Sequence, residues 1–150
     1  MRIRVYRIYL YSIIMILVIG GKFQGKLDFV KNNFDIDEKH IFDCEKKYLF
    51  NITYKNLNST DKFSVVDNLE HYVLRKTEEG LDTKDILVDF MSINFDEKTI
   101  FICDDVSEGL VPLDKVERQY RENLGKILCY ISAHSTDVYN VLYGIGRKIK

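Results

Sequence analysis

The feature that most constrains this chain is a short apolar run that ends in two glycines. Residues 13–19 (Ile-Ile-Met-Ile-Leu-Val-Ile) are apolar without a break, and the glycines follow directly. A run this short, rich in branched side chains and ended by glycine, is typical of a strand buried on both faces. Helical spacing comes next, because Leu27, Val30 and Phe34 fall on one stripe. The sequence therefore predicts a strand, a glycine-rich loop and a helix in direct succession.

The loop itself has the Gly-x-x-x-x-Gly-Lys pattern of a phosphate-binding loop. Its backbone N–H groups would point inward at a phosphate, and the N-terminus of the next helix adds partial positive charge. Lys26 would reach the β- and γ-phosphates, whereas Leu27 stands where a Ser or Thr normally offers a hydroxyl to Mg²⁺. The alternative is a plain glycine turn between strand and helix. The predicted nucleotide-binding residues are Gly20, Gly21, Lys22, Phe23, Gln24, Gly25, Lys26 and Leu27.

Composition narrows the class of protein. The chain has 150 residues, of which 46% are hydrophobic and 30% charged, and this suits one globular domain with a real core. A net charge of −1 argues against a nucleic-acid-binding protein held by bulk electrostatics. Three cysteines without a Cys-x-x-Cys pair indicate neither a disulfide framework nor a zinc site. We therefore expect a cytoplasmic protein.

The first residues superficially resemble a signal peptide. Arginines precede the apolar stretch 8–19, but no small-residue cleavage site follows it. The stretch is also too short for a membrane span and is interrupted by Ser12. We interpret residues 1–14 as an arm that adds nothing to the fold or lies outside the natural protein. Residues 15–150 are expected to form one nucleotide-binding domain without a membrane partner.

Strands and helices alternate along the rest of the chain. Further strands are predicted at 63–67, 99–103 and 138–143, and short ones at 41–42 and 48–52. Helices are predicted at 69–79, from Asp82 or Thr83 to about 95, and over about twenty residues after Pro112. Residues 56–61 have the composition of a loop and 147–150 that of a basic tail. This alternation predicts an α/β, P-loop NTPase-like three-layer domain with a mostly parallel sheet and helices on both faces.

Acidic residues come directly after two of these strands. Asp67 ends one, and Asp104 with Asp105 ends the other, so they would share one sheet edge with the glycine loop. Carboxylates opposite a phosphate loop are what a Mg²⁺–nucleotide site needs. We therefore predict Asp67 and Asp105 as catalytic residues and Mg²⁺ ligands beside Lys26. The alternative for Asp67 is a helix N-cap.

Several strings then resemble one enzyme family. Residues 104–112, Asp-Asp-Val-Ser-Glu-Gly-Leu-Val-Pro, are similar to the Asn-Glu-Val-Gly-x-Gly-Ile-Val-Pro of the bifunctional adenosylcobinamide kinase / adenosylcobinamide-phosphate guanylyltransferase family of cobalamin biosynthesis. Residues 118–125 resemble its Arg-Arg-Phe-Arg-Asp-x-x-Gly, and residues 137–145 its closing Glu-Val-x-x-Val-Val-x-Gly-Ile. The glycine loop resembles Gly-Gly-Ala-Arg-Ser-Gly-Lys-Ser, and residues 66–69 resemble Val-Asp-Cys-Leu.

The resemblance implies a kinase that moves the γ-phosphoryl group of ATP or GTP onto the aminopropanol hydroxyl of adenosylcobinamide. It implies that nucleotide and corrinoid are the partners and that the chain forms a homo-oligomer, expected to be a trimer. Because Leu27 replaces the hydroxyl residue, we expect Mg²⁺ to act weakly or indirectly. Arg118 and Arg121 would contact phosphate, or else form a solvated helix face.

One family segment is missing from the sequence. Family members carry a His-Arg pair and a Trp before the Asp67 strand, and that histidine takes up GMP. This chain has no Trp, and its His40 is followed by Ile41. We therefore expect the guanylyltransferase half to be lost. The alternative is a non-catalytic relative that binds a nucleotide or corrinoid and serves an assembly or regulatory role.

Overall fold

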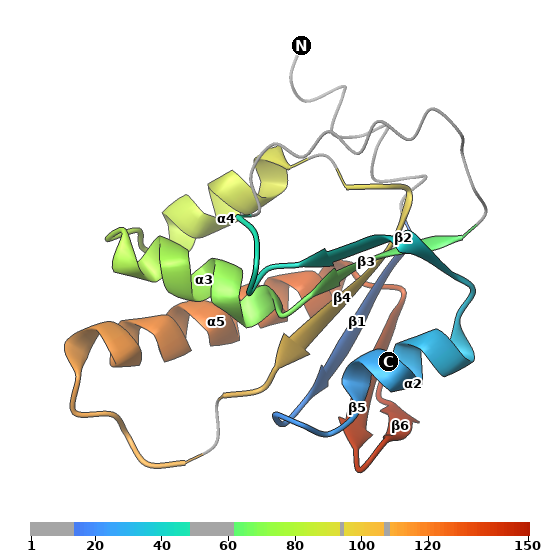
Figure 1. Cartoon of the computed structure of the whole chain (residues 1–150). Helices are drawn as coiled ribbons and strands as arrows, with labels where there is room; N and C mark the ends of the chain where they lie inside the picture. The colour runs from blue at the N-terminus through green and yellow to red at the C-terminus, as the bar shows by residue number, and fades with distance from the viewer. Residues whose placement is uncertain (1–13, 49–61, 94, 107–108) are drawn as a thin grey trace.

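The computed structural model describes residues 14–48, 62–93, 95–106 and 109–150. A six-stranded sheet runs through them in the order β2-β3-β4-β1-β5-β6, and helices cover both of its faces (Figure 1). In chain order the elements are β1 (Ile14–Gly20), α2 (Lys26–Asn33), β2 (Ile36–Asp43), β3 (Phe63–Asp67), α3 (Leu69–Glu78), α4 (Thr83–Ser92), β4 (Lys98–Asp104), α5 (Lys115–His134), β5 (Asp137–Leu142) and β6 (Ile145–Lys148).

The first strand lies in the middle of the sheet. β1 pairs in parallel with β4 on one side and with β5 on the other, and β3 and β2 extend the parallel sheet beyond β4. The carboxyl ends of these strands consequently meet at one edge of the sheet. The α/β fold with a mostly parallel sheet, predicted from the alternation of strands and helices, is confirmed.

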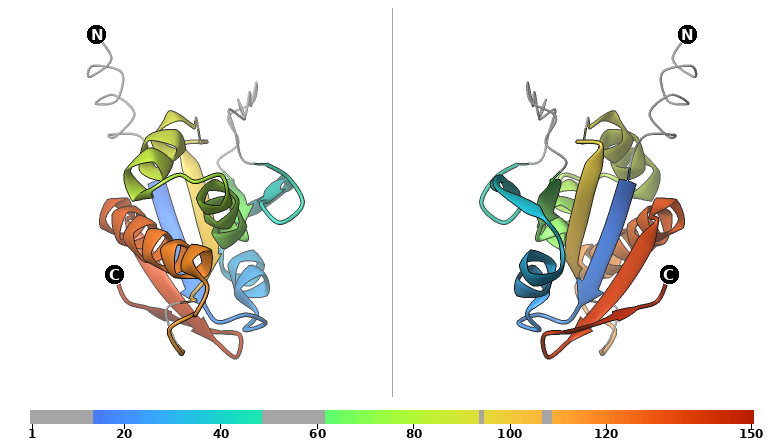
Figure 2. Two further views of the ribbon diagram at one scale, coloured as in Figure 1. Left: turned by 90° about the vertical axis from the view of Figure 1, so that its left-hand side faces the viewer. Right: turned by 90° about the vertical axis from the view of Figure 1, so that its right-hand side faces the viewer.

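The two faces of the sheet follow from the alternation of side chains along β1. Ile16 and Val18 pack with Phe29 and Val30 of α2 in one core cluster. Leu17, which points the other way, belongs to the larger cluster with α3, α4 and α5. Figure 2 shows α2 alone on one face and the other three helices together on the opposite face. A strand buried on both faces is what the unbroken apolar run predicts.

The C-terminal segment corrects one expectation. Residues 147–150 were expected as a basic tail, but Arg147 and Lys148 belong to β6, which pairs antiparallel with β5. The turn between these strands consists of Tyr143 and Gly144, with φ angles of 51° and 77°. Two consecutive positive φ angles are typical of a type I′ hairpin turn, which sets two strands side by side over a minimal loop.

Smaller differences concern element bounds and the edge of the sheet. β2 begins at Ile36, well before the short strand expected at 41–42, and α4 ends at Ser92. Asp82 is the N-cap of α4, and its side chain accepts a hydrogen bond from the Asp85 N–H. The strand expected at 48–52 falls outside the described residues except for its first position, and so does the loop expected at 56–61. Of the arm expected over 1–14, only Ile14 is described, and it begins β1.

A buried amide holds the helices of the larger face together. Asn123 of α5 is fully buried; its Nδ2 donates to the Thr77 hydroxyl of α3 at 3.0 Å, and its Oδ1 accepts from the Thr83 hydroxyl of α4 at 2.8 Å. This junction ties α3, α4 and α5 to one another on that face of the sheet. In the described part of the chain, no helix has both the length and the apolar character needed to cross a bilayer.

Candidate functional site

The glycine loop connects β1 to α2 in a conformation that two of its glycines make possible. A Cβ on Gly20 would lie 2.4 Å from the carbonyl oxygen of Val141, so no larger residue fits there. Gly25 has a φ angle of 82°, which side chains rarely adopt, and it directly precedes the helix. The C-terminal hairpin holds the loop, because Gly144 N–H donates to the carbonyl of Gln24 at 2.7 Å and Tyr143 N–H donates to its side chain at 2.8 Å.

Lys26 begins α2, and its side chain is folded into the loop. Its ammonium group donates to the carbonyl oxygen of Gly21 at 2.7 Å and lies 2.6 Å from Oδ1 of Asp104. Only 8% of the residue is exposed. The ammonium group therefore lies on the inner side of the loop, where the phosphate-binding interpretation needs it.

The acid beside Lys26 is Asp104 and not the predicted Asp105. Asp104 is the last residue of β4, and the strand's alternation turns the next side chain away. Asp105 is exposed and is not among the residues that line the pocket described below, although its N–H donates to the carbonyl of Gly20 at 2.9 Å. The structure thus brings Lys26 and Asp104 together and places Asp105 outside this contact.

Asp67 ends β3 and lines the pocket. The pKa of its carboxyl group is raised to about 6, chiefly by burial and also by the nearby acids Asp43 and Glu70, against the opposing effects of the Asn68 N–H and Lys26. Asp67 is not the helix cap that was the alternative to a site role, because the N-cap position of α3 is Asn68. Its Oδ1 accepts the N–H of Asn68 at 2.8 Å.

Glu70 and His71 also belong to the site, and neither was predicted from the sequence. Glu70 is 5% exposed, and its Oε2 accepts the backbone N–H of Asp104 at 2.9 Å. Its Oε1 lies 3.9 Å from Nε2 of His71. Burial raises the pKa of Glu70. The available signal is a Glu in the first helical turn after a strand that ends in an acid, a pattern equally typical of a helix cap.

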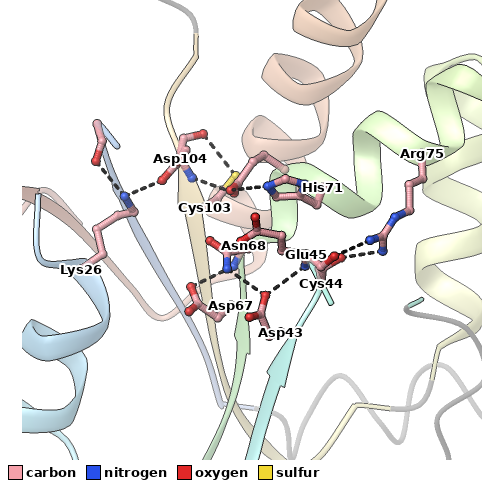
Figure 3. A network of polar contacts seen from close by, with 12 residues as sticks. Lys26, Asp43, Cys44, Glu45, Asp67, Asn68, His71, Arg75, Cys103 and Asp104 are labelled. Atoms are coloured by element: carbon pink, nitrogen blue, oxygen red, sulfur yellow. Dashed lines mark hydrogen bonds and ion pairs between the residues drawn. The ribbon is translucent and has the colours of Figure 1, made fainter. Parts of the chain in front are cut away.

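Together these residues line a pocket of about 340 Å³. Figure 3 shows the polar contacts among several of them, including Lys26, Asp67, His71 and Asp104. The lining residues of the pocket come from the glycine loop, the start of α2, the ends of β3 and β4, the first turn of α3 and the segment after β2: Lys22, Phe23, Gln24, Gly25, Lys26, Leu27, Asp28, Glu45, Asp67, Asn68, Glu70, His71, Ile102 and Asp104. Five of them are acids and two are lysines. A polyphosphate entering this pocket would need additional positive charge to offset the acids.

The segment after β2 is fixed as a wall of the pocket by one arginine. Arg75 of α3 donates to the carbonyl oxygens of Cys44, Glu45 and Lys47 at 2.5, 2.6 and 2.9 Å. Its guanidinium group also lies 4.7 Å from the ring centre of Tyr48. These contacts place Glu45 opposite the glycine loop.

Arg118 and Arg121 do not line this pocket. Arg118 donates to the carbonyl oxygens of Pro112 and Leu113 at 3.0 and 2.7 Å, and Arg121 donates to that of Leu110 at 2.9 Å. Both side chains therefore hold the segment before α5 against the helix. Their predicted contact with phosphate stays a prediction.

The donor set is compatible with Mg²⁺. In the described ranges, no three His, Cys, Asp or Glu side chains gather into a metal-binding group. Mg²⁺ usually takes only one or two carboxylates together with waters and phosphate oxygens, so a full protein cage is not required. Asp67 and Asp104 offer such oxygens, and the acidic excess of the lining residues favours a cation.

A comparison with known protein families identifies the family of this chain. The family model described as cobinamide kinase / cobinamide phosphate guanyltransferase matches residues 29–149. The match begins inside α2, so the interpretation of the glycine loop rests on its own geometry. No individual curated protein matches the chain. A match over this much of the sequence shows that the chain belongs to the cobinamide kinase / cobinamide phosphate guanylyltransferase family, whose enzymes serve the biosynthesis of cobalamin.

Proposed function

We propose that this protein is a nucleoside-triphosphate-dependent kinase that transfers the γ-phosphoryl group of ATP or GTP to the aminopropanol hydroxyl of adenosylcobinamide. The observation that carries the proposal is the pocket in which Lys26 lies under the glycine loop, with Asp67 and Asp104 facing it. The family supports a phosphotransfer role in the same pathway. The cytoplasm is the proposed location.

Lys26 and the loop N–H groups would bind the phosphates. The ammonium group now pairs with Asp104 at 2.6 Å, and a bound phosphate would share it with this carboxylate. Asp67 would accept the proton of the acceptor hydroxyl or orient a water. A carboxyl group with a pKa of about 6 is well matched to proton transfer near neutral pH.

Mg²⁺, when bound, would neutralise charge on the phosphates. Asp67 and Asp104 are the residues that would hold it, directly or through water, in place of the Asp67 and Asp105 pair predicted from the sequence. Leu27 supplies no oxygen, and it is a partly buried pocket residue. We therefore propose that Mg²⁺ acts weakly or indirectly here.

The guanylyltransferase half is proposed to be lost, because the sequence has no His-Arg pair of the family kind. A homo-oligomer, with a trimer as its expected form, also stays a proposal from the family resemblance. The exposed apolar side chains of Leu110, Val111 and Leu113 are of the kind that a subunit interface covers. The alternative function is a non-catalytic nucleotide- or corrinoid-binding relative, which Leu27 favours.

The test is calorimetry of ATP and GTP binding with and without Mg²⁺, followed by mass spectrometry of adenosylcobinamide incubated with the preferred nucleotide. A kinase binds the nucleotide and yields a product heavier by one phosphoryl group. Nucleotide binding without product supports the non-catalytic alternative. If neither nucleotide binds under any condition, the phosphate-loop interpretation is wrong and the glycines form only a turn.

A further inference from the structure

We propose that His71, oriented by Glu70, contacts the terminal phosphoryl group of the bound nucleotide and makes the pocket prefer a triphosphate over a diphosphate. This inference rests on the proposed function, because it assigns a role within the same pocket. Both residues lie in the first turn of α3 and line the pocket together with the glycine loop.

The sheet order gives the direction in which the phosphates would extend. The glycine loop follows β1, and the ammonium group of Lys26 reaches from there to Asp104 at the end of β4. β3, which leads into α3, lies on the far side of β4. Lysine in such a loop meets the β- and γ-phosphates. A phosphate chain that starts over the loop and passes Lys26 therefore ends towards the first turn of α3, where His71 lies.

A connected set of contacts links the two sides of the pocket. Lys26 pairs with Asp104, whose backbone N–H donates to Oε2 of Glu70 at 2.9 Å. The other oxygen of Glu70 lies 3.9 Å from Nε2 of His71. The Glu70 side chain is 7% exposed and the His71 side chain 36%, so the carboxylate is buried while the ring is accessible from the pocket. At 3.9 Å the two groups are not hydrogen-bonded, but the attraction between the carboxylate and the ring nitrogen favours this orientation of the imidazole.

The charges of this wall explain why a histidine matters there. The wall formed by the segment after β2, the end of β3 and the start of α3 carries the acids Glu45, Asp67 and Glu70. The amide of Asn68 in the same wall donates to Asp43 at 2.8 Å. Among the described residues lining this wall, His71 is the only basic side chain. Without it, the terminal phosphate would face three carboxylates and the Asn68 amide, which already donates to Asp43, and this costs binding free energy.

The test compares ATP with ADP in the presence of Mg²⁺, or GTP with GDP if the wild type binds guanine nucleotides more tightly. The proteins are the wild type, His71→Gln, Glu70→Gln and the control His40→Gln. His40 lies on β2, contacts Asp37 at 3.1 Å and does not line the pocket. We expect His71→Gln to weaken triphosphate affinity about 5- to 20-fold, the range of one hydrogen bond to a charged group, and to change diphosphate affinity less than about twofold.

Glu70→Gln should weaken triphosphate affinity selectively but less strongly, because glutamine keeps an acceptor for the Asp104 N–H. A second readout uses the folded wild type: the imidazole NMR signal of His71 should shift with the triphosphate and not with the diphosphate. Equal effects of His71→Gln on both nucleotides, or none, would overturn the inference and leave the proposed function standing. If the wild type binds no nucleotide, the proposed function fails first, and this inference fails with it.

Discussion

The ammonium nitrogen of Lys26 lies 2.6 Å from Oδ1 of Asp104, and the two side chains are only 9% and 17% exposed. Burying such an ion pair costs desolvation free energy, and replacing one of the two residues leaves the other charge buried without its partner. The pair therefore holds the lysine in place inside the loop, and in the proposed function a phosphate oxygen would compete with the carboxylate for it. It also means that substitutions of Lys26 affect stability as well as binding.

The first prediction concerns Lys26. Lys26→Ala should weaken nucleotide affinity by about 1.5–3 kcal/mol, the scale of a charge-assisted hydrogen bond, because the phosphates lose their nearest cation. Lys31→Ala, an exposed lysine in the last turn of the same helix, is the matched control and should leave affinity unchanged. Calorimetry measures both, with circular dichroism to confirm folding. Unchanged affinity in a folded Lys26→Ala protein would show that the glycines form only a turn.

The second prediction concerns Leu27 and Mg²⁺. Leucine cannot donate an oxygen, so we expect nucleotide affinity to depend weakly on Mg²⁺ and phosphotransfer to be well below the roughly 1–100 s⁻¹ of ordinary kinases. Leu27→Ser should raise both the Mg²⁺ dependence and the rate. The measurement is adenosylcobinamide phosphorylation by the two proteins at matched Mg²⁺. A wild type that already turns over at a full kinase rate would contradict the prediction.

The third prediction concerns Asp67 and pH. The pKa of its carboxyl group is about 6 in the folded protein, against 3.8 for an ordinary aspartate, so between these values the folded state holds a proton that the unfolded state releases. Stability therefore falls as pH rises from about 4 to about 6, by at most about 3 kcal/mol. Asp67→Asn keeps the acceptor for the Asn68 N–H and removes the charge. It should be more stable than the wild type at pH 8 by about 1–3 kcal/mol, and the difference should shrink below pH 5.

Urea denaturation of both proteins at several pH values measures this effect. Asp82→Asn, at the exposed N-cap of α4, is a control for replacing a carboxylate by an amide away from the pocket. Equal stability of wild type and Asp67→Asn at every pH would show that the carboxylate is compensated within the pocket.

The fourth prediction concerns the guanylyltransferase reaction. Because the family's His-Arg segment has no counterpart here, incubation with labelled GTP should leave no acid-labile GMP on the protein. His71 lines the pocket, but we place it at the terminal phosphate and away from the α-phosphate that a GMP intermediate needs. Radiolabel retention after denaturing chromatography is the measurement. Labelling that disappears in His71→Gln, His40→Gln or a His134 variant would show that the reaction is retained.

Much of the fold could be predicted because its elements have strong local signals. The local signals are the apolar run of β1, the strands that end in an acid, and the amphipathic pattern of α5. The alternation of strands with helices predicts a parallel sheet. β6 was missed because its four residues, with Arg147 and Lys148, have the composition of a solvated tail. Only the pairing with β5, set by the type I′ turn, makes this segment a strand.

The sequence predicted the edge of the sheet at which the candidate site lies, but not which individual side chains line it. Asp104 and Asp105 are equivalent in the sequence, and a shift of one position reverses the side to which a strand residue points. The role of Glu70 depends on a hydrogen bond to Asp104, 34 positions further along the chain, for which no local pattern exists. Its burial near the pocket arises from the packing of α3 against β4, which joins segments distant in the sequence.

The contact between the glycine loop and the C-terminal hairpin has a consequence for how this protein folds while it is being synthesised. The loop and β1 are synthesised before their partners, because β1 pairs with residues 98–104 and 137–140, and Gln24 contacts Tyr143 across 119 positions. Contacts this distant in sequence slow folding because a long stretch of chain must be closed before they form. On the ribosome, the nascent chain therefore carries an apolar, unpaired central strand through most of its synthesis. In the proposed function, a nucleotide would stabilise the fold only after the hairpin has emerged from the exit tunnel.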